Sequence, residues 1–248
     1  MQKIIFCILT VIVFWGCKDK GREDTLVQEG LKYIEQKNYT KALQVFQESC
    51  QKNNIWGCFN LGVMYEQGQG VRKDVDIAST YWEKACGLGH AQACNNLGML
   101  YDGYISPYKK NILKAEEYYQ KACDLEMMWG CYNLALLYTQ TSKKDIDHIM
   151  QLYKKACDED IYPACHNLGA IYASANLAQN DFQKALKLYK KACDGKMGIS
   201  CNNIGLMYVF GVLGQSSVSD ALPYFQKACD LNNAEGCANY NKALREVK

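Results

Sequence analysis

Lys121-Ala122-Cys123-Asp124, followed by Gly130-Cys131-Tyr132-Asn133-Leu134, is the clearest copy of a stretch that occurs six times in this 248-residue chain. In every copy two cysteines stand eight positions apart. The pairs are Cys50/Cys58, Cys86/Cys94, Cys123/Cys131, Cys157/Cys165, Cys193/Cys201 and Cys229/Cys237. First cysteines recur every 34 to 37 residues. A period of this size is typical of stacked supersecondary units rather than of one closed core.

Each unit predicts two antiparallel helices joined by a short turn. In the first helix, small residues at −8 and −1 and an aromatic residue at −4 share one face with the first cysteine. In the second helix, a small residue precedes the cysteine, and Leu, Gly and Tyr follow at +3, +4 and +7. The aromatic residues are Phe46, Trp82, Tyr119, Tyr153, Tyr189 and Phe225, and the +7 tyrosines, Tyr65, Tyr101, Tyr138, Tyr172 and Tyr208, are predicted to be core. The pattern predicts an all-α, right-handed α-solenoid.

The boundaries of the units follow from the same pattern. Residues 39–248 are interpreted as six repeats of about 36 residues. Residues 18–38 are interpreted as a tether and a capping helix over about Asp24 to Gln36, with Asn38 or Thr40 capping the next helix. The last helix, from about Ala234 to Val247, is polar and suits a C-terminal cap. The second helices are expected to start near Ile55, Ala91, Met127, Ile161, Gly198 and Ala234.

An export signal is expected at residues 1–17. A charged start precedes an apolar run from Ile4 to Trp15, and Gly16 follows. Phe14-Trp15-Gly16-Cys17 resembles a bacterial lipobox, in which Cys17 becomes the lipidated first residue; simple release by signal peptidase is the alternative. We therefore expect an exported protein, either a periplasmic or outer-membrane lipoprotein or a secreted one. Membrane contact is expected only through the lipid anchor.

The paired cysteines are expected to oxidise outside the cytoplasm, with free buried thiols as the alternative. A bridge closing nine residues stabilises by about 2–3 kcal/mol in the entropic model. Zinc is disfavoured, because no Cys-x-x-Cys occurs and His90, His148 and His166 do not recur with the repeat. A net charge of +2 does not indicate the broad basic surface that is typical of nucleic-acid-binding proteins. No metal and no cofactor are expected.

Two serines match the Ser-x-x-Lys element of serine β-lactamases. They are Ser49, followed by Lys52, and Ser106, followed by Lys109. The Ser-Asp-Asn and Lys-Thr-Gly elements are absent, and Ser49 occupies a packing position where other repeats have alanine. No other hydrolase or phosphate-binding motif is present. The sequence therefore leaves enzymatic activity open and shows no site for it.

Two polar positions recur with the repeat. The residue two after the second cysteine is always asparagine: Asn60, Asn96, Asn133, Asn167, Asn203 and Asn239. Carboxamides donate and accept hydrogen bonds, so a row of them in a concave groove suits an extended peptide backbone; bonds to neighbouring helices are the structural alternative. The lysines two before the first cysteine are interpreted as a solvated face, with carboxylate binding as the alternative: Lys84, Lys121, Lys155, Lys191 and Lys227.

The repeat Lys155-Ala156-Cys157 … Cys165-His166-Asn167-Leu168-Gly169-Ala170-Ile171-Tyr172 resembles the Sel-one-like repeat, a relative of the tetratricopeptide repeat. With its paired cysteines and export signal, the chain resembles the Helicobacter cysteine-rich protein family over residues 24–248. The resemblance implies an exported, disulfide-stapled solenoid. It also implies two functions described for members: penicillin binding with weak β-lactamase activity, and interaction at the host interface. Ala135 departs from the family's notch glycine, and loops after 68–74 depart from its loop.

The interpretation that combines these features is an exported or lipid-anchored interaction scaffold. Its expected partner is a protein or peptide, such as a host or cell-envelope protein, bound in the concave groove. A β-lactam hydrolase is the alternative, and a periplasmic assembly factor is a third hypothesis.

Overall fold

The computed structural model describes residues 24–141, 145–174, 181–214 and 217–247. The expected signal at 1–17 and Cys17 lie outside these residues. The chain divides into two compact units, Met1–Leu88 and Gly89–Lys248, and each is described by itself.

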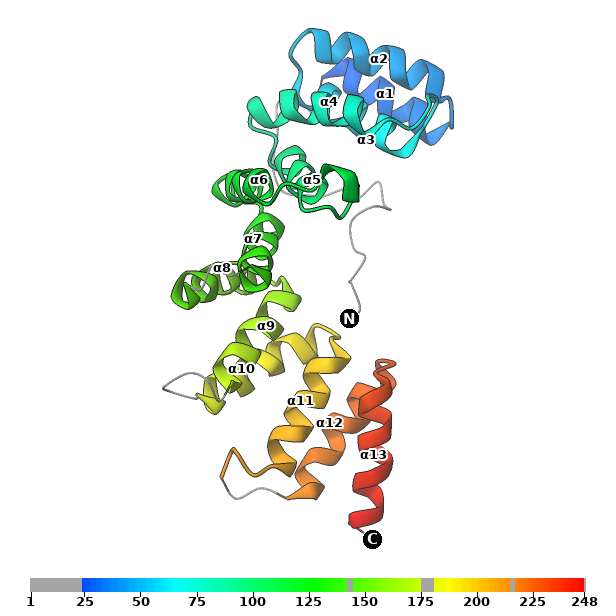
Figure 1. Ribbon diagram of the computed structural model, residues 1–248. Helices are drawn as coiled ribbons and strands as arrows, with labels where there is room; N and C mark the ends of the chain where they lie inside the picture. The colour runs from blue at the N-terminus through cyan, green and yellow to red at the C-terminus, as the bar shows by residue number, and fades with distance from the viewer. Residues whose placement is uncertain (1–23, 142–144, 175–180, 215–216, 248) are drawn as a thin grey trace. The chain divides into compact units, whose positions relative to one another are not determined.

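The described part of the first unit, residues 24–88, contains four helices: α1 (Thr25–Glu35), α2 (Tyr39–Gln51), α3 (Ile55–Gln67) and α4 (Val75–Gly87). Each packs against the next, as Figure 1 shows. A helix is present where the sequence analysis expected one, with Asp24 as its N-cap. Asn38 caps α2 by accepting a hydrogen bond from the backbone N–H of Lys41 at 3.3 Å.

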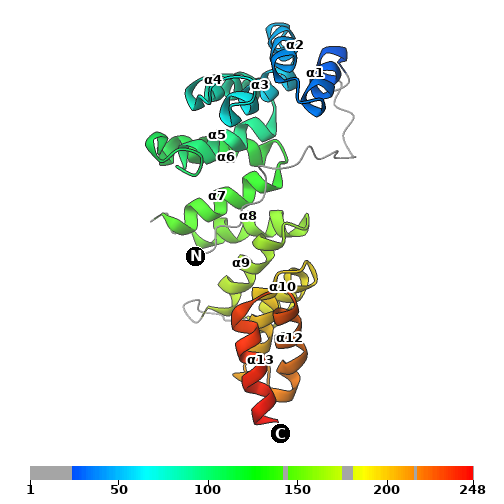
Figure 2. The same ribbon diagram turned by 90° about the vertical axis from the view of Figure 1, so that its right-hand side faces the viewer.

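The second unit contains nine α-helices among its described residues and one 3-10 helix, η1 (Pro107–Lys109). Figures 1 and 2 show consecutive helices of this unit side by side. The predicted helix starts are confirmed to within one residue. The α-helices are α5 (Ala91–Tyr101), α6 (Ile112–Asp124), α7 (Met128–Gln140), α8 (Ile146–Asp158), α9 (Tyr162–Ala173), α10 (Phe182–Asp194), α11 (Gly198–Val209), α12 (Val218–Asp230) and α13 (Ala234–Glu246).

The predicted packing faces are buried. The aromatic residue at −4 of every even-numbered helix from α2 to α12 is at most 4% exposed, and the small residue at −1 is fully buried. The aliphatic side chains at +3 of the odd-numbered helices are also buried, as Leu61 and Leu97 are. These stripes supply the apolar burial that holds adjacent helices together. The all-α solenoid of helical repeats is therefore confirmed.

The twelve cysteines of the six predicted pairs are all disulfide-bonded. Five of the predicted bonds join cysteines within one unit, with Cα atoms 4.4 to 4.9 Å apart: Cys50–Cys58, Cys123–Cys131, Cys157–Cys165, Cys193–Cys201 and Cys229–Cys237. Each of these bonds closes a three-residue turn between an even helix and the odd helix that follows. The residue three positions after the first cysteine has positive φ in these turns: Asn53, Glu126, Asp160, Lys196 and Asn232. We call these five segments the cysteine turns.

The predicted pair Cys86/Cys94 differs from the other five. Cys86 lies near the end of α4 in the first unit, whereas Cys94 lies in α5 of the second unit. Both side chains are buried, and both cysteines are disulfide-bonded, so the alternative of free thiols is wrong for them as well. The structure thus confirms oxidation of Cys86 and Cys94, and their pairing with each other stays a prediction.

Aromatic rings pack on glycines at four of the other helix junctions. A Cβ added at Gly205 would lie 2.5 Å from the ring of Phe225, so glycine is required for this approach. The same relation joins Gly62 to Trp82, Gly98 to Tyr119 and Gly169 to Tyr189. We call these contacts the glycine notches. They join α3 to α4, α5 to α6, α9 to α10 and α11 to α12.

Two sequence interpretations need correction. Of the +7 tyrosines only Tyr101 is buried; the other four are half-buried, and Tyr65 and Tyr208 stack on tyrosines of the next helix at 5.6 and 5.5 Å. The interpretation of the −2 lysines as a solvated face is incomplete: Lys84, Lys121, Lys155 and Lys227 are exposed as expected, but these lysines also make specific contacts. Several of their ammonium groups bind the C-terminal end of the even helix one repeat earlier.

Three of these lysines donate to the carbonyl oxygen of a first cysteine. Lys84 reaches Cys50 at 2.8 Å, Lys155 reaches Cys123 at 3.2 Å and Lys191 reaches Cys157 at 2.7 Å. A cation here meets the negative end of the helix dipole and adds a second hydrogen bond to a carbonyl that already accepts one from a backbone N–H of the turn. The lysines therefore connect one repeat to the next.

Candidate functional site

The six recurring asparagines all lie on odd-numbered helices, and each is half-buried. They share a face with the residues four positions before and three positions after them. On α7 these are Trp129 and Leu136, and on α11 they are Ile199 and Leu206. This face, which we call the odd-helix face, combines carboxamides with partly exposed apolar side chains.

Several of the asparagines bond along the stack. Nδ2 of Asn133 donates to Oδ1 of Asn95 at 2.8 Å, and Nδ2 of Asn239 donates to Oδ1 of Asn202 at 2.8 Å. Asn95 and Asn202 are buried, so these bonds satisfy polar groups that would otherwise be costly. The structural alternative therefore accounts for part of the row. The recurring position before the asparagine, which carries Asn95 and Asn202, was missed by the sequence analysis.

Three of the remaining asparagines bond other groups. Asn60 donates to the carbonyl oxygen of Trp56 in its own helix at 2.9 Å. Asn203 forms a hydrogen bond with Tyr189 that lowers the pKa of this tyrosine, although burial raises it more. Asn167 bonds Tyr132, whose pKa is raised to about 12 mainly by burial. The structure thus gives these carboxamides fixed orientations.

A pocket of about 210 Å³ opens beside Asn203. Its wall is apolar apart from Asn203 and the phenol of Tyr189, and it is formed by the end of α9, the start of α10, α11 and the loop after α11. The lining residues are Ala173, Phe182, Tyr189, Asn203, Leu206, Met207, Phe210 and Val212. Of the sequence-predicted groove residues, the structure therefore brings Asn203 to a pocket. Phe182 and Phe210 were missed, although the apolar loop Phe210 to Leu213 signalled an unusual connection.

A second pocket, of about 370 Å³, lies between α6 and α7 and is lined by acidic groups. Glu116 and Glu117 line it with Leu113, Gln120 and Tyr138. The hydroxyl of Tyr138 donates to Oε1 of Glu116 at 2.8 Å. Burial and this carboxylate raise the pKa of Tyr138 to about 12, so the phenol stays protonated.

Ser49 does not fit the role of a nucleophile. Its side chain is fully buried, and its Oγ has no hydrogen-bond partner among the described residues. Ser106 lies in a loop and precedes the short helix η1, without a side-chain capping bond. A serine nucleophile needs an adjacent base and access to substrate, and Ser49 has neither.

The histidines are structural groups rather than a cluster. His90 accepts a hydrogen bond at Nδ1 from the backbone N–H of Ala93 at 3.2 Å, and burial lowers its pKa to about 4. His166 bonds Ser200 at 2.9 Å, and burial lowers its pKa as well. Within the described ranges no three His, Cys, Asp or Glu side chains are grouped to hold a metal ion. Nor does any helix there have the length and apolar character to cross a membrane.

The fold and its periodic site define a helical repeat protein with disulfide-closed turns. Six consecutive matches to the Sel1 repeat model cover residues 26–54, 57–90, 91–127, 130–160, 163–196 and 198–233, and the chain belongs to the Sel1 repeat family. Most of the matched repeats pair an odd helix with the even helix after it. Four of the five cysteine turns therefore lie where one matched repeat meets the next, and the fifth, Cys229–Cys237, lies at the end of the last matched repeat.

The family resemblance inferred from the sequence is confirmed by individual relatives. HcpC of Helicobacter pylori, whose name assigns it provisionally to the beta-lactamases, is 48% identical over 48 residues, 19% of this chain and 17% of the relative. Cytochrome c oxidase assembly factor 7 of Xenopus tropicalis is 40% identical over 62 residues, 25% of this chain and 27% of the relative. The chain spans a third or less of the length of the first curated relatives that it matches.

A solved structure supports the fold over most of the chain. A Sel1 repeat protein from Oxalobacter formigenes superposes with a TM-score of 0.74 at 22% identity, over 82% of this chain and 84% of that one. At this identity the likeness shows the fold alone. Repeat proteins of this kind generally bind protein partners, and numerous disulfides are typical of an oxidising, extracellular or periplasmic environment.

Proposed function

We propose that this protein is an exported scaffold that binds an extended segment of another protein along the odd-helix face. The observation that carries the proposal is the set of half-buried asparagines on the odd-numbered helices of the second unit, where Asn133 and Asn203 are flanked by partly exposed apolar side chains. Carboxamides pair with peptide N–H and C=O groups, while apolar neighbours supply contact area. The disulfides support export, since they persist in oxidising compartments.

The hydrogen bonds within the row support this function rather than oppose it. A carbonyl oxygen has two lone pairs and an amide nitrogen two donors, so one bond leaves capacity for another. The bond of Asn203 to Tyr189 fixes the carboxamide beside the pocket. Side chains fixed before binding lose less conformational entropy on binding.

The test is selection of random twelve-residue peptides by the oxidised full chain, followed by affinity measurements on variants. Asn167→Ala and Asn203→Ala should weaken binding of selected peptides at least tenfold. Gln183→Ala, which removes an exposed carboxamide from α10, is the matched control and should leave affinity unchanged. Denaturant unfolding of each variant separates lost contacts from lost stability.

Unchanged affinity in both asparagine variants, together with lower stability, would show that the row is only structural. Turnover of a β-lactam by the same preparation, lost in Ser106→Ala, would replace the scaffold proposal by the hydrolase alternative.

A further inference from the structure

We propose that the pocket beside Asn203 holds a large apolar side chain of the bound segment, and that lysines of α10 bind acidic residues next to it. This inference rests on the proposed function and names the chemistry of its partner: an acidic peptide with one aromatic or large aliphatic anchor.

The size and lining of the pocket suit one apolar side chain. Its volume is about 210 Å³. An apolar cavity of about 150 Å³ already binds benzene. Phe182, Leu206 and Phe210 are among its apolar lining residues, and Asn203 is its carboxamide. A phenylalanine or leucine side chain therefore fits, with Asn203 placed to meet the adjoining backbone.

Apolar side chains remain exposed around the pocket. Phe210 is 72% exposed although it lines the pocket, and Val209 beside it is 40% exposed. Ile199, on the odd-helix face of the same helix, is 42% exposed. Contiguous exposed apolar groups of this kind mark interaction sites on soluble domains.

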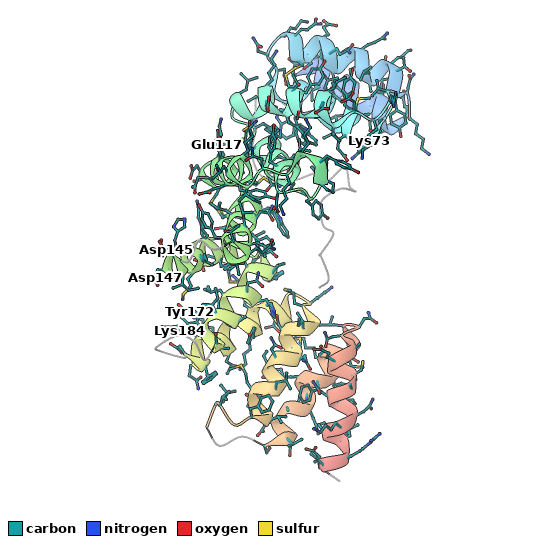
Figure 3. The ribbon with its side chains drawn as sticks, in the orientation of Figure 1. Lys73, Glu117, Asp145, Asp147, Tyr172 and Lys184 are labelled. Atoms are coloured by element: carbon teal, nitrogen blue, oxygen red, sulfur yellow. A yellow bond between two sulfur atoms is a disulfide. The ribbon has the colours of Figure 1, made fainter. Side chains whose placement is uncertain are left out.

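The charge around α10 is positive. Residues 181–196 contain five lysines and two aspartates. Lys184 pairs with Asp181 at 3.0 Å, and Lys191 pairs with Asp160 at 2.9 Å. Figure 3 shows Lys184 next to Tyr172, where α9 meets α10, and its Nζ lies 5.2 Å from the centre of that ring.

Two other lysines of α10 are not neutralised by an ion pair with a carboxylate. Lys187 and Lys190 are exposed, and neither forms an ion pair with any described residue. The charge of Lys190 acts on Tyr208, near the end of α11, which places positive charge close to the apolar loop at Phe210. Charge complementarity therefore favours acidic residues beside the apolar anchor.

The pocket between α6 and α7 is an internal contrast. Glu116 and Glu117 line it, so it has the opposite charge and disfavours an acidic segment. Figure 3 shows Glu117 on α6, well separated along the second unit from Lys184 on α10. Reversing the charge of a peptide should therefore abolish binding at α10.

The test is fluorescence anisotropy with labelled synthetic peptides and the oxidised full chain. The probe contains Glu-Glu-Phe-Glu-Glu between Gly-Ser flanks; one control has Ala for Phe, and another has Lys for every Glu. We expect the probe to bind at least tenfold more tightly than either control. Phe210→Ser should remove the preference over the alanine control, and Lys190→Glu should remove the preference over the lysine control.

Tyr108→Ser is the matched control, because Tyr108 is an aromatic residue 99% exposed in a different loop. It should bind like the unmodified protein. Equal binding of the three peptides, or undiminished binding to Phe210→Ser, would overturn the inference. Self-association that Phe210→Ser abolishes would also overturn it, by making a second copy the occupant.

The outcomes separate this inference from the proposed function. If random selection yields peptides that depend on Asn167 but not on Phe210, the scaffold stands and the acidic anchor is wrong. If neither selected peptides nor the probe bind, both proposals fail.

Discussion

Cysteine turns and glycine notches join the same helices by different physical means. A cysteine turn has three residues and a covalent bond, and it tolerates a non-glycine residue with positive φ such as Glu126. A glycine notch spans a connection of seven to ten residues and relies on a ring packed against a bare backbone, as Phe225 packs on Gly205. The cysteine turns therefore all have the same length and are closed by a covalent bond. The loops at the glycine notches differ in length, and there ring packing holds the two helices together.

The largest expected loss of stability comes from removing the aromatic ring of a glycine notch. Phe225→Ala should lower the free energy of unfolding by about 3–5 kcal/mol, because it removes a buried ring and leaves a cavity. Urea unfolding monitored by circular dichroism measures the change. Tyr108→Ala, at an exposed aromatic, is the control. A loss below 1 kcal/mol in Phe225→Ala would mean that the notches do not hold the stack.

Low pH should destabilise the protein through the N-terminus of α5, where His90 is the N-cap. Burial lowers the pKa of His90 from 6.5 to about 4, so the unfolded chain binds a proton that the folded chain excludes. Stability is therefore complete above pH 6.5 and falls as the pH drops towards 4, by roughly 3 kcal/mol. His90→Asn, which copies the capping residue Asn54, should remove most of this loss. An unchanged pH profile in that variant would contradict the assignment.

Removing the disulfide of one cysteine turn should lower the free energy of unfolding less than removing the ring of a glycine notch. Cys193→Ala/Cys201→Ala should lower the free energy of unfolding by about 2–3 kcal/mol, the entropic value for so short a loop. Helical circular dichroism before unfolding should persist, since ring packing remains. If this variant loses more stability than Phe225→Ala, the ranking of the two junctions is reversed.

A buried serine lies beside the cysteine turn Cys50–Cys58. Ser49 is fully buried and its hydroxyl has no partner among the described residues, whereas the other repeats have alanine there. Ser49→Ala should raise the free energy of unfolding by about 1 kcal/mol. Ser106→Ala is the comparison. A destabilised Ser49→Ala would reveal a hydrogen bond that the structure does not contain.

The smallest effect concerns the positive-φ position. Glu126→Gly should stabilise by about 0.5 kcal/mol, since relief of left-handed strain slightly exceeds the entropy cost of glycine. Gly89 has positive φ at the equivalent position, so Gly89→Ala should change stability in the opposite direction. Differential scanning calorimetry detects both shifts. Stabilisation in both variants would exclude backbone strain as the cause.

Sequence periodicity predicted the parts of the fold that depend on spacing within one repeat. The cysteine pairs and the aromatic at −4 indicated which faces are buried, because helix geometry alone decides this. It did not predict the bond from Lys191 to the carbonyl oxygen of Cys157, or that from Asn239 to Asn202, because these contacts join different repeats.

The candidate site was predicted only in part for the same reason. Asn203 was found because it recurs, whereas Phe210 lies in a connection that does not repeat and Phe182 is the first residue of α10. Their proximity depends on how α9, α10 and α11 pack, which no single repeat encodes. The charge of α10 was visible in the sequence, but its closeness to an apolar pocket was not.

The most direct test of the scaffold account is amide hydrogen exchange of the oxidised full chain, with and without a selected peptide. The account predicts slower exchange at the half-buried positions of α7, α9 and α11 around Asn133, Asn167 and Asn203, with even-numbered helices changed little. Protection confined to the even-numbered helices, or no protection by a peptide that binds, would contradict a binding surface on the odd-helix face.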